Sequence, residues 1–128
     1  MNKADFERRV AETVDSLPDW VRRKMDNVAV VAEDRPSKAL CRLMGIAWAD
    51  GLLGLFEGPS RLEREAGEST LCRVVLYRRM IEDEAGGDAG LSRVIRETLA
   101  HELGHYFGMD DAAIEEFEEA WERARKPG

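Results

Sequence analysis

Apolar residues recur every three or four positions near the start of the chain. Between Ala4 and Leu17, charged residues separate the apolar ones, which are Phe6, Val10, Val14 and Leu17. This spacing predicts an amphipathic helix that buries one face. After Pro18, we expect a short second helix over Asp19–Met25.

Three later runs have the composition of strands. Val28–Ala32 is an unbroken apolar run rich in β-branched residues. Leu52–Glu57 is interrupted by Gly54, so we expect a weakly paired strand at the edge of a sheet. Leu71–Tyr77 is more continuously apolar, which favours the central strand. Residues 37–49 are expected to form one or two short helices, and Pro59–Ser69 a loop.

The C-terminal part predicts two more helices. The first covers Ala89–Phe107, with Asp88 as its cap and Gly108 as its stop. The second begins at a cap formed by Asp110 or Asp111, and it buries Ile114, Phe117 and Trp121. Together these patterns predict an α+β fold with a small mixed sheet of about three strands.

Composition excludes several classes of protein. The chain has 128 residues, a net charge of -7 and 35% charged residues, as expected for one globular domain over residues 1–128. The excess of acidic residues disfavours nucleic acid and anionic membranes as partners. No run is apolar enough for a signal peptide or a membrane span, so we expect a cytoplasmic protein. We also expect a monomer. Cys41 and Cys72 lie in apolar stretches and are interpreted as core thiols.

The most informative segment is His101-Glu102-Leu103-Gly104-His105, which contains both histidines of the chain. On a helix, positions i and i+4 differ in direction by only about 40°, so both imidazoles leave the same face and can reach one metal ion. Neutral imidazole is a good ligand for Zn²⁺, and catalytic zinc sites use three protein ligands and a water. A third ligand must come from elsewhere in the chain.

The residues after His105 extend the pattern to HExxHxxGxxD. A left-handed conformation at Gly108 would let the chain double back and bring Asp111 towards the metal. Water in the remaining position would be acidified by Zn²⁺. Glu102 would accept a proton from this water and pass it to the leaving amine.

These residues can also be interpreted without this metal site. His101 and His105 can be a structural pair, and Asp111 can be a helix cap, although Asp110 is available for that role. A glutamate of the last helix, within Glu115–Glu122, can replace Asp111 as the third ligand. These glutamates otherwise form the solvated face of the helix.

The chain resembles the minimal zincin-like metallopeptidases, with the HExxHxxGxxD motif of a metzincin-type variant. The resemblance spans most of the chain, through Asp15-Ser16-Leu17-Pro18, Asn27–Val31, Leu53–Gly58, Thr70–Arg79 and the motif itself. It implies a zinc peptidase whose metal ligands are His101, His105 and Asp111 and whose general base is Glu102. It also implies a minimal zincin-like fold, in which an N-terminal helix, the HExxH helix and a short C-terminal helix accompany the sheet.

The resemblance further implies how a substrate binds. In zincins, an extended peptide adds to an edge strand that runs antiparallel to the internal one, which here would be Leu52–Glu57 beside Leu71–Tyr77. The chain lacks a methionine after Met109, so it has no Met-turn, and little sequence follows Asp111 to form a far wall of the cleft. Tyr77, Tyr106 and Arg78 are alternative donors to the scissile carbonyl. A catalytically weak metal- or peptide-binding protein of zincin fold is therefore the alternative function.

Overall fold

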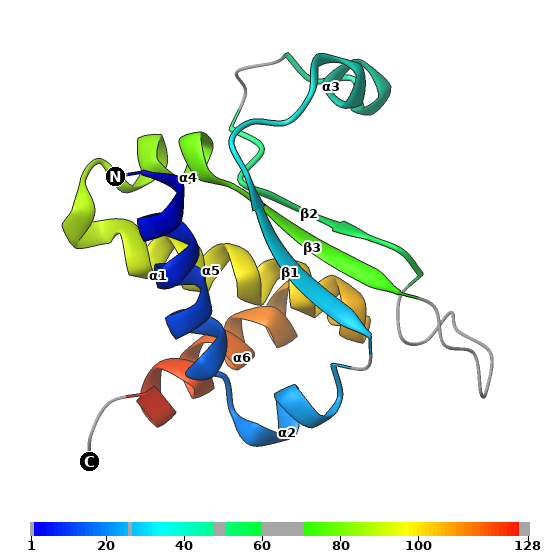
Figure 1. Cartoon of the computed structure of the whole chain (residues 1–128). Coiled ribbons are helices and arrows are strands. Elements are labelled where there is room, and N and C mark those ends of the chain that lie inside the picture. Colours follow the sequence, from blue (N-terminus) through cyan, green and yellow to red (C-terminus); the bar gives the residue numbers. More distant parts are fainter. Residues whose placement is uncertain (1, 26, 48–50, 60–70, 126–128) are drawn as a thin grey trace.

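Nine elements make up the part of the chain that the computed structural model describes, which is residues 2–25, 27–47, 51–59 and 71–125 (Figure 1). The strands are β1 (Val28–Glu33), β2 (Gly54–Glu57) and β3 (Cys72–Tyr77). The helices are α1 (Lys3–Asp15), α2 (Asp19–Arg23), α3 (Lys38–Met44), α4 (Arg78–Ala85), α5 (Asp88–Phe107) and α6 (Asp111–Arg125). This is the expected α+β class.

The sheet has the strand order β1-β3-β2, so the last strand in sequence lies in the middle. β1 pairs with β3 in parallel, with Val30 opposite Val74. β2 pairs with β3 in antiparallel orientation, with Phe56 opposite Val74. The prediction of a central strand at Leu71–Tyr77 and an antiparallel edge strand in Leu52–Glu57 is therefore confirmed.

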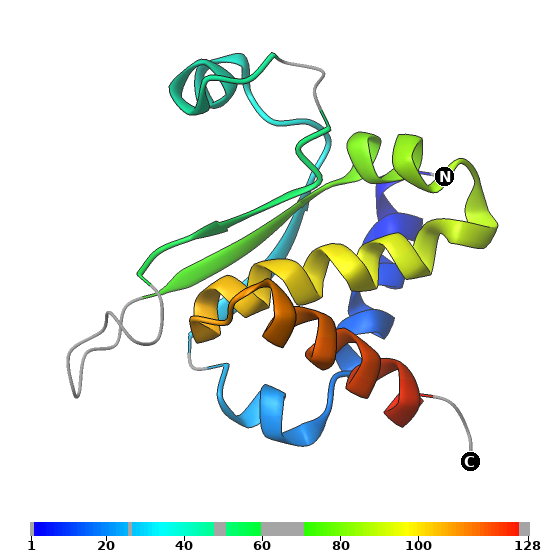
Figure 2. The ribbon, with the colours of Figure 1, turned by 180° about the vertical axis from the view of Figure 1, so that it is seen from behind.

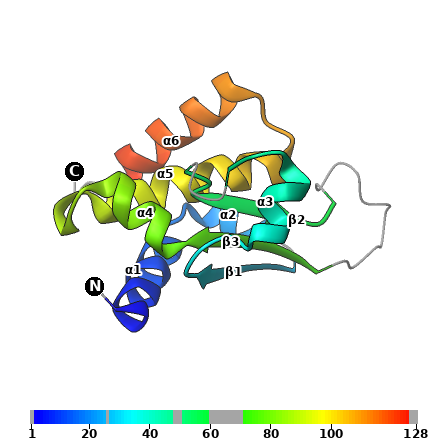
Figure 3. The same ribbon diagram turned by 90° about the horizontal axis from the view of Figure 1, so that it is seen from above.

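The helices lie mainly on one face of this sheet. α5 packs against β2 and β3 and lies between them and α6, as Figure 3 shows from above. α1 lies beside α5 and β1, and α6 runs back along α5 (Figure 2). Alternate residues of β3 divide between the two faces: Val74 and Leu76 join the core under the helices, whereas Val75 and Tyr77 pack with Leu40 on the other side.

The periodic positions of the N-terminal segment behave as their spacing predicts. Phe6, Val10 and Leu17 are buried, and Val14 is partly buried against the same core. The indole Nε1 of Trp121 donates to the Ser16 carbonyl oxygen at 3.0 Å, which joins α6 to the end of α1. The N- and C-terminal helices therefore belong to one core.

Several predicted boundaries differ from the structure. The edge strand begins at Gly54 rather than Leu52, although the Tyr77 amide still donates to the Leu53 carbonyl at 2.9 Å. Asp88 is the first residue of α5 and not its cap, because Gly87 occupies that position. Most of the predicted loop Pro59–Ser69, and the end of the segment 37–49, lie outside the described residues.

The helix α4 has no counterpart among the predicted elements. It follows β3 directly, with Tyr77 as its N-terminal cap residue and no side-chain hydrogen bond at the cap. The sequence therefore has neither a turn nor a polar cap residue that would indicate the start of this helix. Arg78, the first residue of α4, is only 7% exposed. Its guanidinium contacts Asp34 at 3.1 Å and Glu82 at 3.3 Å, and these contacts compensate its burial.

Within the described residues, no helix has the length and apolar character needed to cross a membrane.

Candidate active site

The two histidines lie one turn apart on the exposed side of α5. Their Nε2 atoms are 3.2 Å apart, and both side chains are exposed to solvent. The intervening residues Leu103 and Gly104 are buried against the core. The burial of these two residues fixes the rotation of α5 about its axis, and this rotation directs both imidazoles outwards.

The separation of the two nitrogens fits a zinc ion. Zinc binds histidine nitrogen at about 2.0–2.1 Å, and at a tetrahedral angle two such nitrogens lie roughly 3.3 Å apart. The observed 3.2 Å between His101 and His105 is close to this value. Neutral imidazole is also the chemistry that zinc prefers, so two of the three predicted ligands are placed for a shared ion.

The end of α5 has the geometry that the motif predicts. Gly108 has φ 72°, a left-handed conformation, and the Met109 amide donates to the Gly104 carbonyl at 2.9 Å. The Asp110 carboxylate accepts from the Ala113 amide at 2.8 Å, so Asp110 caps α6. Of the two residues expected as possible caps, Asp110 therefore takes this role.

Asp111 is the exposed first residue of α6. Among the residues that the structure describes, no group of three or more His, Cys, Asp or Glu side chains is gathered closely enough to hold a metal ion. The structure brings His101 and His105 together but does not add Asp111 to them. The third ligand stays a prediction.

Glu102 lies half-buried beneath the edge strand, where β2 approaches α5 closely. A β-carbon on Gly54 would lie 2.8 Å from the Thr98 methyl carbon, 3.1 Å from the Val75 carbonyl oxygen and 3.4 Å from Glu102 Cγ. Only glycine leaves room for this approach. Gly54 therefore allows the predicted general base to lie directly next to the strand predicted to hold a peptide.

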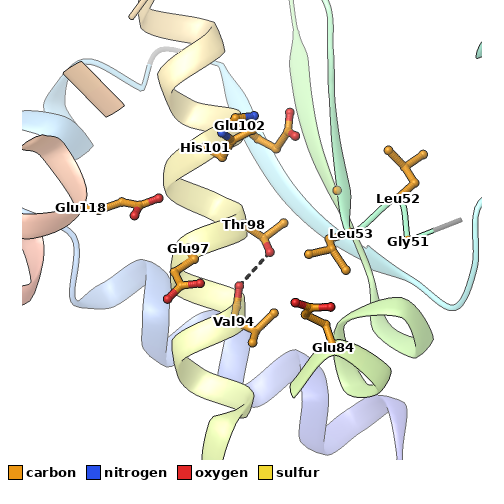
Figure 4. Close-up of a pocket in the computed structure, with 11 residues that line it drawn as sticks. Gly51, Leu52, Leu53, Glu84, Val94, Glu97, Thr98, His101, Glu102 and Glu118 are labelled. Carbon is orange, nitrogen blue, oxygen red and sulfur yellow. Dashed lines mark hydrogen bonds between the residues drawn. The ribbon is translucent and has the colours of Figure 1, made fainter. Parts of the chain in front are cut away.

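A cavity of about 340 Å³ opens beside His101 and Glu102 (Figure 4). Its other walls come from the segment before β2, from α4, from the preceding turns of α5 and from α6. The charged residues among them are Glu84, Glu97 and Glu118. We call this cavity the acidic pocket.

The sequence analysis assigned no role to Glu84 or Glu97, and it placed Glu118 only within the range Glu115–Glu122, as a solvated residue or an alternative third ligand. Helical spacing could have found Glu97, because it precedes His101 by four positions and so shares its face. Glu84 belongs to the helix that the sequence analysis missed, and only the packing of α6 on α5 brings Glu118 to the pocket. The pKa of Glu118 is raised, first by burial and then by the charge of Glu97.

None of the three alternative donors to a substrate carbonyl lines this pocket. Tyr77 is 1% exposed and packs on the other face of the sheet, and Tyr106 is fully buried, with its ring 5.6 Å from that of Phe56. Arg78 is held by Asp34 and Glu82. These side chains stabilise the fold around the site rather than face it.

A helix that presents HExxH beneath an antiparallel edge strand defines the zincin class of protein. The chain belongs to the zincin-like metallopeptidase family, whose model matches residues 25–121. The match extends from Met25, just after α2, to Trp121, so it includes the whole sheet and the HExxH helix. Among curated proteins, no match to this sequence is found.

Proposed function

We propose that this protein is a zinc-dependent peptidase. The observation that carries the proposal is the 3.2 Å separation of the His101 and His105 Nε2 atoms on the exposed side of α5. Glu102, on the same helix, lines the cavity that opens beside His101. Membership of the zincin-like metallopeptidase family supports the same chemistry.

His101 and His105 would hold the zinc ion, with Asp111 as the third ligand. When bound, zinc polarises carbonyl groups and makes water more acidic. The donor set of two imidazoles and one carboxylate is the usual type for catalytic zinc.

Glu102 would move the proton during hydrolysis. Its carboxylate accepts a proton from water as the water oxygen bonds to the peptide carbonyl carbon. The same proton then passes to the amide nitrogen as the carbon–nitrogen bond breaks, which leaves a carboxylic acid and an amine. The position of Glu102 next to Gly54 supports this role, because a peptide beside β2 would present its carbonyl near that carboxylate.

The substrate would bind in extended form along the outer side of β2. Because the Tyr77 amide donates to Leu53, the residues Leu53, Leu55 and Glu57 direct their backbone groups to β3. Gly54 and Phe56 alternate with them and direct their amide and carbonyl groups to the outer edge. These are the groups expected to bind the peptide backbone.

Zinc titration of the metal-stripped protein by calorimetry tests the site. We expect one tight site, which His101→Ala abolishes and Asp111→Ala weakens. Asp110→Asn is the matched control, because Asp110 caps α6 and lies outside the predicted ligand set. The absence of zinc binding by the wild type would contradict the proposal.

Hydrolysis is tested separately with zinc-loaded protein and a broad peptide library. Glu102→Gln should keep the zinc and lower kcat by about 10²- to 10⁴-fold, the usual contribution of a general base. Full peptidase activity in Glu102→Gln would exclude the role assigned to Glu102.

A metal- and peptide-binding protein with little hydrolysis is the second candidate. It is favoured by the burial of Tyr77, Tyr106 and Arg78, which removes the three expected donors to a scissile carbonyl. Zinc-loaded protein that binds peptides of the library and leaves all of them intact would select this second function.

A further inference from the structure

The acidic pocket combines carboxylates from three helices. Glu84 comes from α4, Glu97 from α5 and Glu118 from α6, and all three line the cavity next to His101 and Glu102. Figure 4 shows Glu97 and Glu118 on one side of α5 and Glu84 on the other. No lysine or arginine occurs among the described residues that line this space. The pocket is therefore negatively charged on the side that adjoins the candidate catalytic residues.

The carboxylates surround a lining that is mainly apolar. Leu53 and Val94 contribute aliphatic side chains. The Thr98 hydroxyl donates to the Val94 carbonyl oxygen at 2.7 Å, and its methyl carbon faces Gly54. The lining thus offers aliphatic contacts with carboxylates at their margin, which complements a long aliphatic side chain that ends in a cation.

The three carboxylates differ in their ion pairs. Glu97 is paired with Arg93 at 3.0 Å. Arg96, the nearby arginine of α5, is paired with Glu122 at 2.7 Å. Glu84 and Glu118 form no ion pair within the parts of the chain that are described. Glu118 is also partly desolvated, and a cation beside it would offset that cost.

We propose that the acidic pocket binds a lysine or arginine side chain of the substrate, next to the scissile bond, and that Glu84 and Glu118 determine this specificity. The inference rests on the proposed function, which places the scissile bond at His101 and Glu102. A charge-assisted hydrogen bond from the substrate's cation to either carboxylate gives the selectivity, and the aliphatic lining holds the stem.

The binding test uses two fluorescein-labelled peptides that are identical except for one central residue, lysine in one and norleucine in the other. Fluorescence polarisation with zinc-loaded Glu102→Gln measures their affinities without hydrolysis. We expect the lysine peptide to bind about tenfold more tightly, since one hydrogen bond to a charged group contributes at least this factor. Glu84→Gln and Glu118→Gln, each added to this background, should reduce the ratio to about threefold or less.

Glu116→Gln is the matched control, because Glu116 is an exposed glutamate of α6 that does not line the pocket. It should leave the ratio unchanged. Zinc affinity should be the same in Glu118→Gln as in the wild type. A loss of zinc affinity in this variant would assign Glu118 to the metal and overturn its role in specificity.

The peptide library separates this inference from the proposed function. Cleavage enriched for lysine or arginine on one side of the scissile bond supports both. Cleavage without such enrichment, or equal binding of the two labelled peptides, overturns the specificity and keeps the peptidase. Zinc-loaded protein that cleaves nothing but prefers the lysine peptide keeps the pocket and overturns the peptidase.

Discussion

Gly104 and Ile114 meet where α5 and α6 pack together, so closely that a β-carbon on residue 104 would overlap with Ile114 Cγ1. The glycine lies within the HExxH segment, directly before His105. Its small size lets α6 return along the buried side of the same turns that carry the histidines on their exposed side.

Replacing Gly104 with alanine should therefore destabilise the protein. Alanine favours a helix over glycine by about 1 kcal/mol. Overpacking costs typically about 1–3 kcal/mol, and a contact as short as the one at Ile114 belongs at the upper end of that range. Urea unfolding should show the net loss. Ile114→Ala removes the opposing atoms, so its cost should be smaller in the Gly104→Ala background than in the wild type. Additive effects would contradict this explanation.

Gly54→Ala should affect both stability and hydrolysis. The added methyl group meets the Thr98 methyl carbon at 2.8 Å, which should cost about 1–3 kcal/mol. It also lies 3.4 Å from Glu102 Cγ, so kcat should fall as the base is displaced. Zinc affinity, measured by calorimetry, should not change.

Thr98→Ser in the Gly54→Ala background provides the control. It removes the methyl carbon that makes the closest contact and should recover most of the stability. If kcat remains low after this recovery, the displacement of Glu102 accounts for the loss. A kcat that recovers in parallel with stability would attribute the whole effect to packing.

Arg78→Ala should destabilise the protein much more than Arg79→Ala. Arg78 is 7% exposed and pairs with Asp34 and Glu82, so its loss leaves two carboxylates without their cation. Arg79 is exposed, and a surface substitution of this kind usually changes stability by no more than about 0.5 kcal/mol. Thermal unfolding measures the melting temperatures of the two variants, in which neighbouring arginines are replaced. Equal melting temperatures would show that the Arg78 contacts contribute nothing.

Stability should fall in alkali because of Tyr77. Burial raises the pKa of Tyr77 from 10.0 to about 12, so the folded state resists deprotonation more than the unfolded state does. The contribution of Tyr77 is complete below pH 10 and is lost as the pH rises towards 12. Urea unfolding at pH 9 and pH 11 should show a smaller loss for Tyr77→Phe than for the wild type. An identical loss in both would contradict this assignment.

The sequence pattern was sufficient to predict the elements in which buried residues recur at a regular spacing. Phe6, Val10 and Leu17 lie on one helical face, and the apolar run of β3 is buried on both faces of the sheet, as its composition predicts. Gly108 and Asp110 also have the roles that helix ends give to such residues. These features depend on neighbours within a few positions, so the sequence reveals them directly.

Other features depend on contacts between distant segments. The buried Arg78 has an ion-pair partner only because Asp34, which directly follows β1, lies beside the start of α4. Glu118 reaches the acidic pocket only because Gly104 lets α6 approach α5. In the predicted site, the spacing of HExxH is enough to bring His101 and His105 together, whereas the position of Asp111 also depends on how the chain turns after Gly108.

The position of β3 in the middle of the sheet also governs how the protein folds during synthesis. β1 and β2 do not hydrogen-bond to each other. Each can pair only with β3, which is the last of the three strands to leave the ribosome. The pairing of Val28 with Cys72 closes a long loop, which slows folding. Until then the β-branched run of β1 is an unpaired edge on a nascent chain, and such segments are prone to aggregate. Chaperone capture during translation should therefore be strongest between the emergence of β1 and that of β3.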